Sequence, residues 1–589
     1  MRDAQRICPL GVFLFSDKES PSAGIIKNSG ASYGIIESFG TRSQNERIPA
    51  MPQSRARRFA FNALLLIAVN LFMRTVGVSF NVYLSNRAGG EVMGLFSLLS
   101  GVYTFAMTLG CGGIHLGTTR MVADSLGRWG ENTPACHREI RRCLRRCLLY
   151  SFIFGAGACL LLFFAAPTVG SDWLGDARTV TSLRVLALTL PPIALTSCMN
   201  GYFTAIRQVA PNALVGMLTQ FVRIGCCSYF LALWLGKGVE STCLALVLGG
   251  ALSELAAFLF TALAYALTLR AKGKKLSEGS NTPPKADDIP SLSKKLLGIT
   301  LPVTCSACLR SGLITLQHIL IPRGLKASGR NWSQALTSYG VLHSMVLPVV
   351  LFPSAFISSF SGLLVPEIAE SHAAGDMDRV ARISRRIIQP ALLFSFGVAG
   401  IMSCFSHELG MLLYNSEEAG IYIRQLAPLI PIMYVDSSVD AVLKGMGEQV
   451  YSMNVNIADA LSSVLMVWFL LPHMGLQGYV ITIYVTETLN TTLSLTRMLR
   501  VSRMAVHLKK QVFGPLLCII GATCIMRLCG MLLPIPHPDT GFKLTLCILI
   551  TTCIYLALLK LTGMIGGEEW RQIKSLFPQS SSRKNESSP

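Results

Sequence analysis

Charged residues are scarce in this chain. Asp, Glu, Lys and Arg make up 14% of its 589 residues, whereas a soluble domain usually carries about 25%. Hydrophobic residues account for 51%, and the mean hydropathy is +0.49. This composition excludes a large soluble domain. Apolar runs of about 20 residues recur along nearly the whole chain, which predicts an all-α polytopic membrane protein.

The chain also lacks the sequence motifs of common enzymes. It contains no Walker A motif, no nucleophile elbow, no HExxH and no glycine-rich nucleotide-binding pattern. Most of the 18 cysteines lie inside apolar runs, where they behave as small hydrophobic residues. Cys305 and Cys308 form a CxxC pair, but no second pair or suitably spaced histidines accompany it. We therefore expect no enzymatic activity, no metal site and no bound cofactor.

Positive charge is in excess, and its distribution indicates a membrane topology. The net charge of +20 would suggest a nucleic-acid partner in a soluble protein, but no soluble domain carries a basic patch here. Instead, Lys and Arg gather in alternate loops, such as segments 138–146 and 272–295. The positive-inside rule then places both termini in the cytoplasm. Membrane lipids with anionic headgroups are the expected partners of these loops.

A window of about 19 residues identifies roughly fourteen apolar spans. They centre near residues 72, 102, 156, 194, 224, 256, 309, 352, 400, 432, 461, 486, 523 and 551. The second and eighth spans lead into amphipathic stretches at about 116–145 and 367–387. We expect these stretches to lie along the membrane surface or at the cytoplasmic ends of the bundle.

Composition divides the chain into six segments. These are an N-terminal extension (1–55), a lobe of six spans (56–270), a polar cytoplasmic linker (271–295), a second lobe of six spans (296–505), two appended spans (506–565) and a cytoplasmic tail (566–589). The first 50 residues are polar and lack an apolar run, and Met51 begins a short basic leader directly before the first span. We therefore expect either a disordered extension or a true start of translation at Met51.

The two lobes contain a weak internal repeat. At a shift of 236 residues, Arg74 matches Arg310, and at a shift of 240, Arg184 matches Arg424. After the second and eighth spans, the segment 123–125 matches 369–371 at a shift of 246. Six spans per lobe is an even number, so both lobes enter the membrane from the same side. Such parallel repeats commonly enclose the substrate path between them.

Three arginines fall near the middle of apolar spans: Arg74, Arg223 and Arg310. A guanidinium at bilayer depth costs at least about 2.5 kcal/mol, so it normally faces a partner or a wet cavity. The repeated placement of Arg74 and Arg310 favours a cationic site, because a guanidinium matches phosphate or carboxylate oxygens. For Arg223, an ion pair with an acid such as Glu254 is the stronger alternative.

Other polar residues in the spans are candidates for ligand or ion binding. Asn81 and Gln317 lie seven residues beyond Arg74 and Arg310, on about the same helix face, where hydrogen bonds to a ligand or to another helix are equally compatible. Coupling to Na⁺ or H⁺ is possible at Asp436, Asp440 and Glu254. Alternatively, Asp436 and Glu487 serve as arginine partners, and Asp440 pairs with Lys444 one helical turn away.

Several stretches resemble the stage V sporulation protein B family of oligosaccharide flippases. These are MRTVG at 73–77, ILIPRGL at 319–325, LVPEIAESHAAGD at 364–376 and YIRQLAPLIPIMYVDSSVDAVLKGMGEQ at 422–449. The family is part of the multidrug/oligosaccharidyl-lipid/polysaccharide flippase superfamily, and the resemblance covers about 56–510. It implies a two-lobed bundle with a V-shaped central cavity. It also implies transfer of a lipid-linked saccharide or peptidoglycan precursor across the bacterial cytoplasmic membrane.

The resemblance further implies that the substrate is a polyprenyl diphosphate, whose diphosphate would suit Arg74 and Arg310. The chain departs from the family at Gln317, near a place where the family often has an acidic residue. This departure weakens any ion coupling that depends on that acid. Two alternatives remain: a drug or cation antiporter of the same superfamily, and a scaffold that recruits wall-synthesis enzymes without transport.

Overall fold

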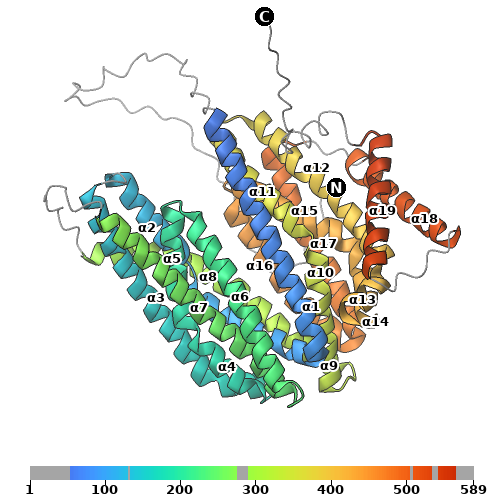
Figure 1. Ribbon diagram of the computed structural model, residues 1–589, viewed down its shortest axis with the longest axis horizontal. Helices are drawn as coiled ribbons and strands as arrows, with labels where there is room; N and C mark the ends of the chain where they lie inside the picture. The colour runs from blue at the N-terminus through green and yellow to red at the C-terminus, as the bar shows by residue number, and fades with distance from the viewer. Residues whose placement is uncertain (1–52, 130–132, 275–288, 505–508, 533–540, 565–589) are drawn as a thin grey trace, which may run out of the picture. The chain divides into compact units, whose positions relative to one another are not determined.

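The computed structural model describes residues 53–129, 133–274, 289–504, 509–532 and 541–564 (Figure 1). Most of the predicted N-terminal extension, most of the linker and the whole tail lie outside these ranges. The first half of the chain forms α1 (Gln53–Cys111), α2 (Ile114–Trp129), α3 (Pro134–Thr168), the π-helical turn η1 (Val169–Trp173), α4 (Thr179–Leu188), α5 (Leu190–Ala205), α6 (Val209–Trp234) and α7 (Val239–Lys274).

The second half of the chain is helical as well. It forms α8 (Ile289–Ala327), α9 (Trp332–Gly340), the π-helical turn η2 (Val341–Val346), α10 (Leu347–Leu351), α11 (Ser354–Ala373), α12 (Met377–Cys404), α13 (Ser406–Tyr414), α14 (Glu417–Leu426), the 3-10 turn η3 (Ala427–Leu429), α15 (Ile430–Gly445), α16 (Gln449–Met474), α17 (Leu476–Ser502), the π-helical turn η4 (Lys509–Phe513), α18 (Gly514–Leu532) and α19 (Gly541–Leu561). The described part of the chain is therefore all-α, as predicted.

Twelve helical segments in the described residues are long and apolar enough to cross a membrane. The first of them, Ala68–Trp129, contains two of the predicted spans, because α1 is interrupted at Gly89 with φ 82°. Helix α17 corresponds to the predicted span near residue 486 but falls below the required hydropathy. Its threonines, Asn490 and Glu487 make it polar. The structure thus gives twelve candidate spans where the sequence predicted fourteen.

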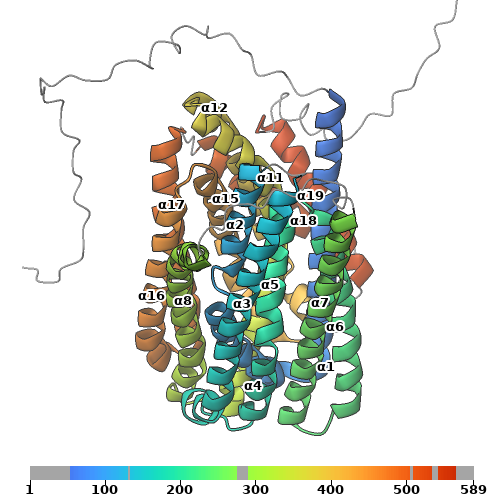
Figure 2. The same ribbon diagram turned by 90° about the vertical axis from the view of Figure 1, so that its left-hand side faces the viewer.

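The two halves repeat one pattern of helix packing, which we follow within residues 62–589. In the first half, α2, α3 and α5 all pack against one another, and α6 packs along α7 (Figure 2). In the second half, α11, α12 and α15 form the corresponding triangle, and α16 packs along α17. The appended helices α18 and α19 contact each other and α12. We call α2–α7 the N-terminal group and α9–α17 the C-terminal group.

Matching interruptions support the same repeat. Helix α4 ends and α5 begins around Thr189, directly before Pro191 and Pro192. In the second half, η3 separates α14 from α15 at residues 427–429, next to Pro428 and Pro431. Proline lacks a backbone N–H and clashes with the preceding turn, so it breaks a helix at such places. Thr189 and Leu429 differ by the 240 positions at which the sequences align.

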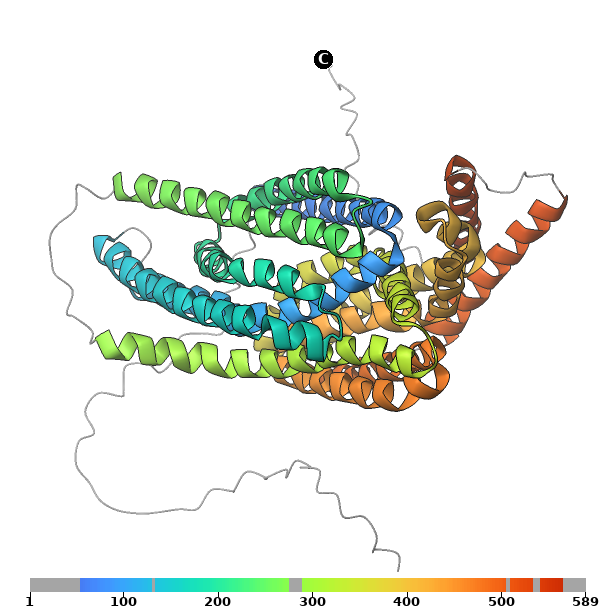
Figure 3. The same ribbon diagram turned by 90° about the horizontal axis from the view of Figure 1, so that it is seen from below.

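Helix α8 belongs to both groups. Its first part packs against α2 and α3, and the rest packs against α16 (Figure 3). Close contacts with α2 require small residues, because a side chain at Gly113 or Gly117 would collide with Thr300. The Thr304 hydroxyl also donates to the Gly112 carbonyl at 2.7 Å. We call the end of the bundle where α8 begins the linker end, and the opposite end, where α1 turns, the Gly89 end.

Candidate functional site

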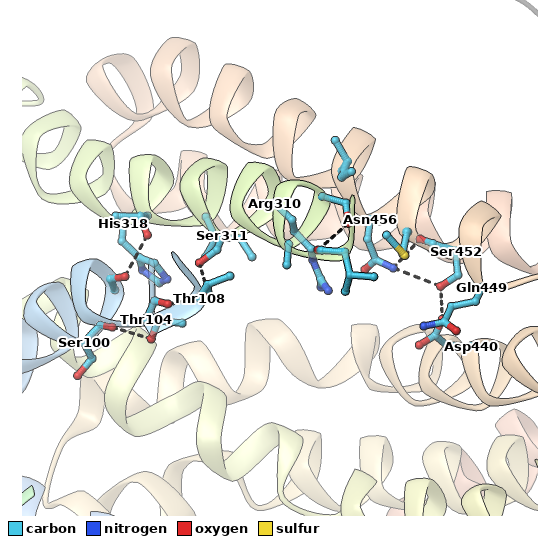
Figure 4. Close-up of a pocket in the computed structure, with 18 of the residues that line it drawn as sticks. Ser100, Thr104, Thr108, Arg310, Ser311, His318, Asp440, Gln449, Ser452 and Asn456 are labelled. Carbon is cyan, nitrogen blue, oxygen red and sulfur yellow. Dashed lines mark hydrogen bonds between the residues drawn. The ribbon is translucent and has the colours of Figure 1, made fainter. Parts of the chain in front are cut away.

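A cavity of about 680 Å³ lies between α1, α8, α15 and α16. The part of α1 that follows Gly89 lines one wall with Ser97, Ser100, Thr104 and Thr108. Helix α8 lines another wall and carries Arg310, Ser311, Thr315 and His318 into the cavity (Figure 4). The remaining polar lining residues are His343, Asp440, Lys444, Gln449, Ser452 and Asn456. Hydroxyl and amide groups of this kind suit a hydroxyl-rich ligand.

Arg310 is the arginine of this cavity. Its side chain points into the cavity between Thr108 and Asn456 (Figure 4). Among the described residues it has no hydrogen bond and no ion pair to a carboxylate. Asp436 and Asp459 lie within electrostatic range, but neither is bonded to it. A guanidinium that keeps its five donors free can bind an incoming anion.

Arg74 is not part of the cavity lining. It is exposed on α1, within electrostatic range of Tyr434 on α15. The structure therefore does not bring Arg74 and Arg310 together on the walls of this one cavity. The sequence repeat indicated a shared position along the helices, but the break at Gly89 and the shared packing of α8 give the two helices different surroundings.

Asn81 and Gln317 also lie outside the lining. The Asn81 side-chain amide donates to the Ser344 carbonyl at 2.7 Å, so Asn81 joins α1 to η2. Gln317 is half-buried on α8, next to His318. The sequence was equally compatible with a hydrogen bond from Asn81 to a ligand or to another helix, and the structure shows the second of these.

Arg223 is paired with Glu254 at 2.8 Å, and its Nε atom donates to Ser253 at 3.2 Å. The two residues lie on α6 and α7, which pack along each other. Both side chains keep some exposure, 42% for Arg223 and 28% for Glu254. This is the ion pair that the sequence gave as the alternative to an anion site. In this arrangement each charge is neutralised by the other.

The acidic candidates of the second half have different partners. Asp440 lines the cavity and pairs with Lys444 at 2.7 Å, one turn away on α15. Its carboxylate also accepts a hydrogen bond from Ser452. Asp436 lies deeper and accepts a hydrogen bond from the Asn490 side chain on α17 at 3.2 Å. Asp440 is thus neutralised locally, whereas Asp436 has only a neutral partner.

Asp459 on α16 was missed in the sequence analysis. It lies within electrostatic range of Asp436 and of Glu487. In the described structure, one carboxylate oxygen of Asp459 and the amide oxygen of Asn490 are buried without a hydrogen-bond partner. The signal was an aspartate inside an apolar span, the same signal that identified Asp436. No three His, Cys, Asp or Glu side chains within the described residues are close enough together to hold a metal ion.

The cavity ends where α1 meets α9 and η2, near Gly89. Gly94 and Gly340 approach so closely that a side chain on either would collide with the other helix. The Ser344 hydroxyl donates to the Met93 carbonyl at 3.1 Å and lies against Ser97. We call this contact of α1 with the end of α9 and with η2 the seam. Glycine is needed at Gly94 and Gly340 because only backbone fits between these helices.

Beyond the seam, a second set of contacts links α1 and the loop between η1 and α4 to the start of α9. The Trp332 indole donates to Asp176 at 3.2 Å, and Ser333 donates to Glu91 at 2.6 Å. Arg178 binds Asp176 at 2.6 Å. Burial alone would raise the pKa of Asp176, but the hydrogen bonds from Arg178 and Trp332 outweigh it and hold this pKa below its ordinary value. We call these contacts the clasp.

Comparison with known proteins identifies the family. Residues 59–372 match the model of the polysaccharide biosynthesis protein family, and residues 329–469 match the MatE model. The chain is 24% identical to stage V sporulation protein B of Bacillus subtilis (strain 168), over 87% of this chain and 97% of that protein. It is 22% identical to the lipid II flippase MurJ of the same organism, over 64% of this chain and 71% of that protein.

A solved structure has the same fold. The lipid II flippase MurJ in an inward closed conformation superposes with a TM-score of 0.62 at 11% identity, covering 85% of this chain and 99% of that one. The fold is therefore that of the MATE- and MurJ-like membrane proteins. The matched residues 59–372 make up more than half of the chain. The chain therefore belongs to the polysaccharide biosynthesis protein family, a family of membrane transporters within the multidrug/oligosaccharidyl-lipid/polysaccharide flippase superfamily.

Proposed function

We propose that this protein moves a lipid-linked saccharide or peptidoglycan precursor, carried on a polyprenyl diphosphate, across the bacterial cytoplasmic membrane by alternating access, opening first to one side and then to the other. The observation that carries the proposal is Arg310, a guanidinium without a bonded partner inside a cavity of Ser, Thr, Asn and Gln side chains. The guanidinium suits the diphosphate, and the hydroxyl and amide groups suit the saccharide. Arg74 supplies further positive charge on α1, whereas the charge of Lys444 is neutralised by Asp440.

We further propose that the chain crosses the membrane fourteen times in two parallel six-span lobes with two appended spans. The break at Gly89 divides Ala68–Trp129 into two crossings, and α17 runs the length of α16, which itself qualifies as a span. The basic loops then place the linker end and both termini in the cytoplasm. In this orientation, the seam and the clasp close the outer end of the cavity.

Ion coupling is proposed at Asp436, with Asp459 and Glu487 as its electrostatic neighbours. The like charges of these acids, together with the unpartnered oxygens of Asp459 and Asn490, favour an added cation, either H⁺ or an Na⁺ held by fewer than three of the acids. Asp440 and Glu254 are weaker candidates because each is held by a basic residue. The cation would balance these charges while the transporter is open to one side of the membrane and would be released when it opens to the other side.

The test is binding of a polyprenyl diphosphate to the purified protein in nanodiscs, read by native mass spectrometry. We expect Arg310→Ala to weaken binding about tenfold or more, because a charge-assisted hydrogen bond contributes about 1.5–3 kcal/mol. Arg310→Lys should be intermediate if a bidentate contact matters. Arg527→Ala is the matched control, since Arg527 is exposed on α18 outside the cavity. Undiminished binding by Arg310→Ala would refute the anion site.

The two other functions predict different results. A drug or cation antiporter would prefer acidic residues at the centre of its cavity, and it would bind cations more weakly after Asp440→Asn and not after Arg310→Ala. A scaffold without transport would complement a null strain fully with Arg310→Ala. A scaffold would complement with both Arg310→Ala and Asp440→Asn, whereas each kind of transporter would fail with one of them. The charge of the bound ligand then separates the two kinds of transporter, because a flippase binds an anion and an antiporter binds a cation.

A further inference from the structure

Two histidines occupy the closed end of the cavity, and nothing in the proposed transport cycle uses them. His318 comes from α8 and His343 from the π-helical turn η2, and both line the cavity. Their rings are 4.5 Å apart between centroids and meet edge to face. Each imidazole can take up one proton near neutral pH, unlike any other neutral side chain in the cavity lining.

The hydrogen bonds of the pair leave one acceptor open. His318 Nδ1 lies 2.7 Å from the Tyr339 hydroxyl on α9. The Tyr339 ring in turn stacks on His343, with 5.4 Å between centroids. His343 Nδ1 is buried without a hydrogen-bond partner among the described residues. An unpartnered buried imidazole nitrogen costs free energy as it stands, and a water molecule that hydrogen-bonds to it would satisfy it, whether or not the nitrogen carries a proton.

The pair is built into the seam, where α1 meets α9 and η2. Ser344, which follows His343, donates to the Met93 carbonyl and accepts from Asn81 through its own carbonyl. Gly101 on α1 lies directly against His318, since a side chain there would meet the imidazole at 3.3 Å. Thr315, one turn before His318, donates to the Gly101 carbonyl at 3.0 Å. Any movement of either ring therefore changes the seam.

The surroundings of the pair hold no nearby negative charge that would stabilise an imidazolium. Segment 92–102 of α1 has no titratable residue. The titratable or charged groups on the other packed elements are Arg310 on α8, Tyr339 on α9, Tyr414 on α13, Glu418 on α14, Asp459 on α16 and Tyr479 on α17. Glu418 accepts a hydrogen bond from Ser338, which directly precedes Tyr339 on α9, but it pairs with neither imidazole in the described structure. A proton on the pair thus creates a charge with no acidic partner in contact.

We propose that His318 and His343 together form a binding site for one proton, and that this proton opens the seam. Two imidazolium rings at this separation would repel each other, so the pair holds one proton at most. The cavity can hydrate the parts of the rings that line it, but His343 Nδ1 is buried, so solvation of a charge at that atom requires α1 and η2 to separate. A π-helical turn supports such a role, because it is a strained element that often marks functional sites. Protonation thereby favours the outward-open state of the transporter.

This inference builds on the proposed alternation between two states, but its test reads the seam and not transport. Hydrogen exchange followed by mass spectrometry, corrected for the intrinsic effect of pH, is measured on the full protein in nanodiscs at pH about 5.5 and about 8. Peptides that cover segments 90–101 and 336–350 report the seam. We expect exchange there to be about fivefold faster or more at the lower pH, the low end of ordinary coupling between sites.

Three variants make the result specific. His318→Gln and His343→Gln keep a neutral polar side chain, so each should reduce or abolish the pH effect at the seam. His473→Gln is the matched control, because His473 is exposed at the end of α16 and outside the cavity. Peptides from α18 report folding of each variant. A pH effect that survives in both glutamine variants would overturn the proposal, as would its absence from the unsubstituted protein. Failure of lipid binding by Arg310→Ala, by contrast, would bear on the proposed substrate alone.

Discussion

Arg223 and Glu254 neutralise each other across α6 and α7 at 2.8 Å, whereas Arg310 in the second half has no such partner in the described part of the chain. The two arginines therefore differ in whether their charge is already neutralised by a neighbouring carboxylate. The first is part of a closed ion pair, and the second retains free donors that face a cavity.

Removing Glu254 should destabilise the protein because it leaves Arg223 uncompensated at membrane depth. We expect Glu254→Ala to cost about 2 kcal/mol, less than for a fully buried pair because both side chains keep some exposure. The double variant Arg223→Ala with Glu254→Ala should recover most of this loss. The measurement is the thermal unfolding midpoint in detergent. Equal midpoints for the single and double variants would argue against the pair as the cause.

A methyl group at Gly340 should keep the seam from closing. The added Cβ would lie 2.6 Å from the Gly94 nitrogen, which no real packing tolerates. We expect Gly340→Ala to make seam peptides exchange hydrogen faster at every pH. Gly225→Ala is the control, because an added Cβ on this helical glycine of α6 meets nothing within 4 Å. If Gly340→Ala leaves exchange at the seam unchanged, the close approach of α1 and η2 is not maintained in the membrane.

Replacing Asp436 should remove any response to the coupling ion. In the unsubstituted protein, a specific cation should raise the unfolding midpoint with concentration, by the usual linkage between binding and stability. Sodium chloride is compared with choline chloride at equal ionic strength, and pH is varied in parallel. We expect Asp436→Asn to abolish the specific response. Asp440→Asn should keep it, since Lys444 already neutralises Asp440. If Asp440→Asn abolishes the response and Asp436→Asn keeps it, the ion site lies at Asp440.

The clasp should be insensitive to pH in the range where the histidine pair responds. The pKa of Asp176 is held below its ordinary value in the folded protein, so its contribution to stability is complete above about pH 4. That contribution is lost only as the pH falls through the lowered pKa. Asp176→Asn should therefore lower the unfolding midpoint by a similar amount at pH about 5.5 and about 8, with a cost of about 2 kcal/mol. A loss confined to the higher pH would contradict this assignment.

The helices, the internal repeat and the family could be predicted from the sequence because each depends on patterns of neighbouring residues. Apolar runs set the spans, and prolines at matching places mark the breaks at Thr189 and at η3. The surroundings of each polar residue depend on how helices rotate against one another, which no local pattern contains. Arg310 reaches the cavity and Arg74 does not, although the repeat aligns them. Asn81 bonds to Ser344, 263 positions away, and only packing brings such residues together.

Helix α8 is held at both of its ends by different partners. Its early turns are fastened to the turn between α1 and α2 by the hydrogen bond from Thr304 to Gly112, and its later turns lie along α16. If these partners move apart, α8 must either release one of them or bend, and Pro302 in its early part lacks a backbone N–H that would resist bending. If the bundle opens by alternating access, as proposed, α8 cannot keep both sets of contacts, so opening toward one face of the membrane would exclude opening toward the other.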